Sequence, residues 1–160
     1  MLMLLSLGCT HRLPISPIKI PVSLTKAGTI INMDFKVNRE YNYGFILRFS
    51  YKKGIFNSGV DLREAMGDPS YHDKNGNIII KNVGVPIPCK VTIRSLINKE
   101  VVYQKSVIPS LSSWGRDWSK SLGDTRLKKG NYNIVVESVN SIPDFDNVLV
   151  LILITELTHK

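Results

Sequence analysis

Apolar and polar residues alternate along most of this chain, and that period-two pattern is typical of β-strands with one buried face. The alternating stretches are rich in β-branched and aromatic side chains, which pack well on a pleated surface. Short groups of turn residues, such as Ala27-Gly28 and Asn98-Lys99, separate them. We therefore expect about eight short strands, the clearest of which are IKIPVSLTK, TIINMDFKV, YNYGFILRFSY and VPIPCKVTIRSLI.

One segment departs from this rhythm. In GVDLREAMGDPS, one helical face can hold Val60, Leu62, Ala65 and Met66. Gly67 and Pro69 follow as a stop signal. We therefore expect one short helix between strands.

A tyrosine near the end of the chain indicates how the strands are arranged. Leu127, Gly130 and Tyr132 precede alternating Ile134 and Val136. This spacing resembles the corner of immunoglobulin-like sandwiches, in which a tyrosine hydroxyl bonds to the backbone across a turn. Together with the many short strands, it predicts an all-β fold: an antiparallel β-sandwich of immunoglobulin-like, Greek-key type.

The final segment, NVLVLILITEL, is apolar without interruption over residues 148–154. It is shorter than the roughly 20 residues that a membrane-spanning helix needs. An uninterrupted apolar run of this length is typical of a strand buried on both faces.

The first residues of the chain bear on where the protein works. Residues 1–8 carry no charge and resemble the end of a secretory signal peptide, directly before Cys9. A small residue before such a cysteine resembles the processing site of bacterial lipoproteins, whose cysteine is then acylated. Cys9 would anchor the chain in the membrane, residues 9–17 would form a tether, and residues 18–160 would form one domain. The alternative is a cytosolic chain with an apolar N-terminus.

The charge of the chain points to acidic partners. The formal net charge is +8 at pH 7, and residues 84–130 hold nine Lys and Arg against three Asp and Glu. Such a balance favours an acidic protein, anionic lipid or lipopolysaccharide. These cations either line solvated strand faces or form a binding surface. Because no basic tract, zinc-finger spacing or recognition helix accompanies them, we expect no nucleic-acid partner.

The sequence offers no set of residues that would carry catalysis. His72 lies in a loop, and the carboxylates of Asp144 and Asp146 have no acidic cluster to pair with. The turn DKNGN does not fit a calcium loop, because Gly76 falls too early and no glutamate closes it. Cys89 alternates with apolar residues in an expected strand and is interpreted as a buried packing residue. We expect no enzyme activity, no metal and no cofactor.

The stretch SSWGRDWSKS is the best candidate for a binding site. It holds both tryptophans of the chain within five residues, among serines and charges. Trp and Arg are enriched at the energetic centres of protein interfaces. We therefore predict partner contacts from Trp114, Arg116, Trp118 and Lys120. The alternative is that one or both indoles plug the open end of the sandwich.

The chain as a whole resembles a family of small bacterial lipoproteins of the outer membrane and periplasm whose domain has no assigned activity. The resemblance covers about residues 18–155. It rests on Cys9 and on PVSLTKAGTI, YGFILRFSYK, MGDPSYHDKNG, GVPIPCKVTI, SSWGRDW and LKKGNYNIVVES.

Some proteins of this general kind act as immunity proteins against secreted antibacterial effectors such as lipases. The resemblance therefore implies a non-enzymatic outer-membrane lipoprotein that faces the periplasm, where it binds and neutralises an acidic protein. The alternative is an envelope module that binds lipopolysaccharide, peptidoglycan or phospholipid headgroups.

Overall fold

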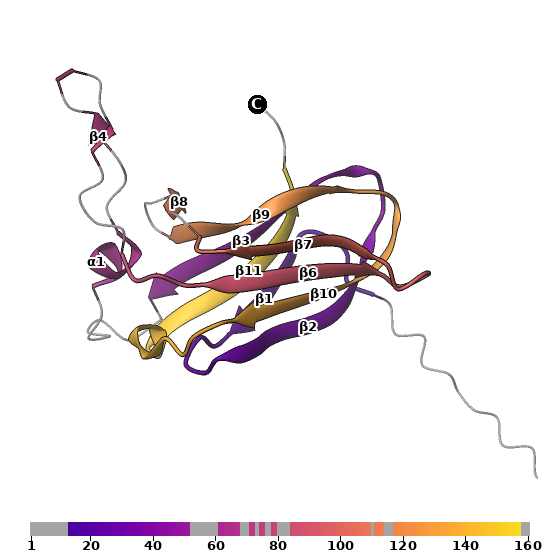
Figure 1. Ribbon diagram of the computed structural model, residues 1–160, viewed down its shortest axis with the longest axis horizontal. Helices are drawn as coiled ribbons and strands as arrows, with labels where there is room; N and C mark the ends of the chain where they lie inside the picture. Colours follow the sequence, from indigo (N-terminus) through magenta and orange to yellow (C-terminus); the bar gives the residue numbers. More distant parts are fainter. Residues whose placement is uncertain are drawn as a thin grey trace, which may run out of the picture.

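Two antiparallel β-sheets pack face to face in the computed structural model (Figure 1). This arrangement confirms the expected all-β sandwich. The structure describes residues 13–51, 61–67, 71–72, 74–75, 78–79, 84–109, 111–113 and 117–157.

The first sheet has five strands, and its order places the last long strand of the chain between the first strand and the third. In spatial order the strands are β1 (Ile18–Val22), β11 (Val148–Glu156), β3 (Tyr41–Tyr51), β9 (Trp118–Leu127) and β8 (Leu111–Ser113).

The second sheet has four strands. In spatial order they are β2 (Gly28–Val37), β10 (Gly130–Ser138), β6 (Cys89–Ser95) and β7 (Val101–Val107). A small separate pair, the expected short helix and a 3-10 turn complete the described elements: β4 (Tyr71–His72), β5 (Ile78–Ile79), α1 (Leu62–Met66) and η1 (Pro143–Phe145).

The two turns named from the sequence differ in what they connect. Asn98-Lys99 lies in the tight turn of the β6–β7 hairpin, where Lys99 adopts a φ of 61°. Ala27-Gly28 instead carries the chain from β1 in one sheet to β2 in the other.

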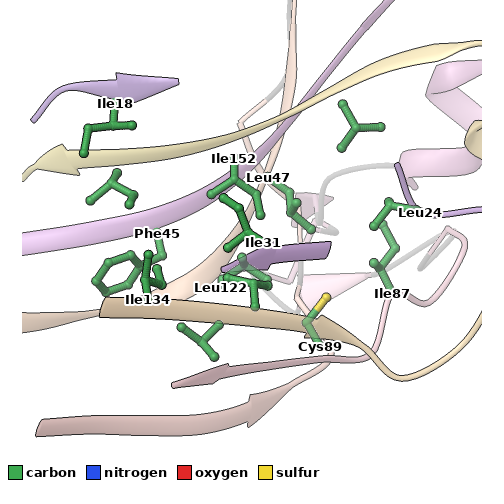
Figure 2. Packing of buried hydrophobic residues seen from close by; sticks show 14 of the residues in the cluster. Ile18, Leu24, Ile31, Phe45, Leu47, Ile87, Cys89, Leu122, Ile134 and Ile152 are labelled. Carbon is green, nitrogen blue, oxygen red and sulfur yellow. The ribbon is translucent and has the colours of Figure 1, made fainter. Parts of the chain in front are cut away.

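The hydrophobic core fills the space between the sheets, as Figure 2 shows for Phe45, Ile134 and Ile152. Cys89 also belongs to this core and is 1 % exposed, which confirms its interpretation as a buried residue. Burial raises the pKa of its thiol to about 11.

The tyrosine corner expected from the sequence is present. The Tyr132 hydroxyl donates to the Lys128 carbonyl at 2.9 Å, across the turn between β9 and β10. A second tyrosine does the same at the β2–β3 turn, where the Tyr43 hydroxyl donates to the Arg39 carbonyl at 3.3 Å. Both turns carry the chain from one sheet to the other, so each hydroxyl fixes a crossing point.

Strand β11 is less enclosed than its sequence indicates. Its inward residues are fully buried, but on its outward side Leu149 is 36 % exposed and Leu151 is only half-buried. The expectation of a strand buried on both faces is therefore wrong for this part of β11.

The segment before β1 links the two sheets. Ile15 forms a parallel bridge with Lys36 of β2, and the Lys36 amide donates to the Pro14 carbonyl at 2.9 Å. Directly afterwards, β1 pairs along its whole length with β11 in the other sheet. Among the described residues, no helix has the length and hydropathy needed to span a membrane.

A candidate interaction site at one end of the sandwich

The longer connections between strands emerge at one end of the sandwich, which we call the loop end. Helix α1, the β4–β5 pair and β8 lie on the left of Figure 1, where the chain runs from β3 to β6 and from β7 to β9. At the opposite end, which we call the turn end, short turns join β2 to β3, β6 to β7 and β9 to β10. Loops that converge on a rigid scaffold are the usual place for binding residues.

Trp118 is the first residue of β9 and marks the loop end. It lies opposite Phe49 of β3 and packs, half-buried, against the core. Its indole meets the Tyr51 ring edge-to-face, with 6.0 Å between the ring centroids. Tyr51 is 45 % exposed, and its hydroxyl accepts a hydrogen bond from the Leu62 amide at 3.2 Å. The aromatic pair thus joins the ends of β3 and β9 to the start of α1.

Charged groups lie on the outward side of the same strands. The Arg48 guanidinium is 4.0 Å from the Asp117 carboxylate, and both side chains are more than a third exposed. Such an exposed pair adds little to stability. The Nε atom of Arg48 is buried and has no hydrogen-bond partner among the described residues.

Lys120 lies on the inward side of β9, opposite Leu47, and is 1 % exposed. Its ammonium donates to the Val85 carbonyl at 3.4 Å. Burial lowers the pKa of this ammonium, because a charge is poorly solvated there. The buried Lys120 side chain thus fills space inside the sandwich at the loop end. Contact between Lys120 and a partner stays a prediction.

Helix α1 and the segment after residue 83 cover that end of the core. The Val85 amide donates to the Ala65 carbonyl at 2.7 Å. Gly84 has a φ of +67°, and a Cβ at this position would lie 2.5 Å from the Met66 carbonyl carbon. Only glycine fits this close approach of backbone to helix.

The residues predicted from the sequence are only partly placed by the structure. Trp118 and Lys120 come together at the loop end, whereas Trp114, Arg116 and Cys9 lie outside the described residues. Sequence reasoning missed Tyr51, although its position at the end of an aromatic strand was a usable signal.

The arrangement at the loop end suits binding. Aromatic rings with part of their surface in solvent, beside an arginine and a carboxylate, offer both apolar area and polar contacts. The described residues contain no group of His, Cys, Asp and Glu side chains that could hold a metal ion.

Comparison with known proteins places the fold. A crystal structure of a protein from Sulfurospirillum deleyianum superposes with a TM-score of 0.72 at 18 % identity, covering 90 % of this chain and 99 % of that one. A second structure, described as the EclA C-terminal domain, a sugar-binding protein, has a TM-score of 0.31 at 13 % identity and covers 92 % of this chain and 84 % of that one. No curated protein matches the chain.

A family model described as a domain of unknown function (DUF5625) matches residues 19–156, which is most of the sandwich. The chain therefore belongs to the DUF5625 family.

Proposed function

We propose that this protein is a non-enzymatic binding protein, anchored at Cys9 on the periplasmic side of the outer membrane, that neutralises an acidic protein partner. The loop end would contact the partner. The observation that carries this proposal is the Tyr51–Trp118 pair, an aromatic patch left partly open at the end where the longer connections converge.

The position of the tether supports the proposal. Ile18, the first residue of β1, lies opposite Ile154, toward the turn end of the sandwich. A tether from Cys9 would therefore join the domain near the end opposite the candidate site. The loop end would stay accessible to a partner while the protein is anchored.

The charge of the chain supports an acidic partner. The net charge of +8 would steer a negatively charged protein toward this one, while a few buried anchors would supply most of the affinity. A secreted effector, such as a lipase with an acidic rim around its active site, fits this description.

The test is capture of the partner by the tagged chain from its own envelope fraction at physiological salt. We expect one acidic protein in a one-to-one complex, and we expect Trp118→Phe combined with Arg116→Ala to weaken the complex tenfold or more. Phenylalanine keeps a ring against the core, so the domain should stay folded. The mass of the native N-terminal peptide shows separately whether Cys9 is acylated.

The matched control is Tyr41→Phe with Arg126→Ala at the turn end, where the Tyr41 ring keeps its place against the core and the Arg126 side chain is 71 % exposed. This variant should bind like the parent. Equal binding by the loop-end variant, or binding only to lipid or polysaccharide that fades steeply with salt, would contradict the proposal.

A further inference from the structure

The outer face of the five-stranded sheet carries a row of leucines. Leu149, Leu151 and Leu153 alternate with the core residues of β11 and so point away from the core. Leu149 is 36 % exposed, Leu151 is half-buried and Leu153 is 5 % exposed. Outward positions of a solvated sheet are normally polar, so this row needs an explanation.

Neighbouring strands extend the row sideways. Leu151 lies opposite the exposed Pro21 of β1, and Leu153 lies opposite Ile46 of β3. The apolar strip thus crosses three adjacent strands. We call Pro21, Ile46, Leu149 and Leu151 the leucine face, whereas Leu153 is already buried by this chain.

The outer face of the second sheet is different. There the Asn133 amide donates to Asn32 at 3.0 Å and to Asp34 at 2.8 Å. Lys90 and Glu137 form an ion pair at 3.9 Å on the same sheet. The exposed valines of this sheet, Val101 and Val102, lie on its edge strand β7. Its interior strands present polar groups, whereas β11, an interior strand of the first sheet, presents leucines, which indicates that the leucine face is covered in use.

The charges around the leucine face favour an anionic surface. Lys19 is exposed and lies opposite Leu153, and Arg48 lies opposite Leu151. A carboxylate, Asp117, approaches Arg48 at the rim. Because each chain carries a net charge of +8, two copies would repel each other, whereas anionic lipid would attract either one.

The position of the proposed anchor favours a lipid bilayer as the surface that covers the leucine face. Strand β1 begins nine residues after Cys9, a length that reaches at most about 30 Å. Strand β1 is also the edge strand next to β11. An acyl chain on Cys9 would therefore hold the leucine face within reach of the membrane surface.

We propose that the leucine face lies against a phospholipid bilayer containing anionic headgroups, with Leu149, Leu151 and Pro21 at the apolar boundary. This inference relies on the proposed anchorage for its geometry. Its contact energy, however, comes from residues of the sandwich, and it goes beyond partner binding at the loop end.

The test uses the full chain as Cys9→Ser, which cannot be acylated. Its binding to vesicles of phosphatidylethanolamine with a minor fraction of phosphatidylglycerol is measured by sedimentation at physiological salt. We expect measurable binding, weakened about tenfold by Leu149→Ser with Leu151→Ser. Leu149→Ser alone, at the most exposed of the three leucines, should give a smaller loss and is the safer variant for folding.

The matched control is Val101→Ser with Val102→Ser on β7 of the other sheet, where the parent valines are 45 % and 42 % exposed. Binding by the control should equal that of the parent. The proposal is overturned if the parent does not bind, if both pairs of substitutions weaken binding equally, or if the parent is a dimer that only the leucine substitutions dissociate. Because the probe chain lacks Cys9, each result is independent of acylation and of partner capture.

Discussion

Lys120 is the residue whose position departs most from what its type would suggest. Lysine is almost never fully buried without a partner, yet this one is 1 % exposed, and its ammonium donates a hydrogen bond of 3.4 Å to the Val85 carbonyl. The alternation of residues along β9 indicates this inward position, because Lys120 lies between Trp118 and Leu122 on the inward side of the strand. The cation is held against the core by its place in the strand.

We expect Lys120→Met to raise the free energy of unfolding by about 1 kcal/mol at pH 7, because it removes a poorly solvated charge and keeps the apolar stem. The unfolded chain holds this proton up to the ordinary pKa of 10.5, whereas the folded chain releases it at lower pH. The contribution of Lys120 to the stability of the parent should therefore rise with pH from its folded pKa toward 10.5. The variant should lack that rise.

Urea unfolding at pH 7 and in mildly alkaline buffer measures both effects, with Lys105→Met at an exposed site of β7 as the control. A variant that is clearly less stable than the parent at pH 7 would show that the ammonium is well paired.

At the scale of elements, helix α1 depends on its contact with the segment that leads into β6. A Cβ on Gly84 would meet backbone atoms of Met66, Ala65 and Gly67 at 2.5–2.6 Å. Gly28 also has a positive φ, of +109°, but a Cβ there would find open space. Substitution of Gly28 would therefore test backbone strain alone, whereas substitution of Gly84 would test strain together with close packing.

We expect Gly84→Ala to cost about 3 kcal/mol of stability and Gly28→Ala about 1 kcal/mol. The difference arises because the backbone at Gly84 must also move away from the helix. Thermal unfolding followed by circular dichroism gives both values. Equal losses of stability in the two variants would mean that the backbone at Gly84 can move away from α1 with little loss of free energy.

Elements with dense local signals could be predicted from the sequence. The β6–β7 hairpin, helix α1 and the corner at Tyr132 each depend on turn residues and spacing within a few positions. Strand order could not be predicted in this way, because β1 pairs with β11 far along the chain. The same limit applies to the site. Tyr51 and Trp118 are 67 residues apart in the sequence, and the alternating pattern does not indicate which strands become neighbours.

At the scale of the whole molecule, a buried thiol and several buried tyrosine hydroxyls lower the stability of the fold at alkaline pH, because each must ionise in a poorly solvated place. Burial raises the pKa of Tyr43 to about 12 and that of Cys89 to about 11, and it raises the pKa values of Tyr103 and Tyr132 as well. A folded-state pKa above the unfolded value adds stability below the unfolded pKa, and this stability is lost as pH rises through the folded one.

For Cys89, the loss should fall between pH 9.0, the ordinary thiol pKa, and about 11. We expect Cys89→Ala to be less stable than the parent at pH 7, because it leaves a small cavity. The gap should narrow by about 1–2 kcal/mol by pH 11, because the variant has no thiol to ionise. Urea unfolding across this range measures the gap, and two parallel curves would disprove the expectation.

The segment from Pro14 to Val22 has a mechanical consequence. It is bonded first to β2 in one sheet and then, residue by residue, to β11 in the other. A pull on the N-terminus along β1 would load these hydrogen bonds together in shear instead of opening them one after another. Force applied through a tether would thus be shared by both sheets, so the sandwich should resist unfolding best at the point where a membrane anchor would pull on it.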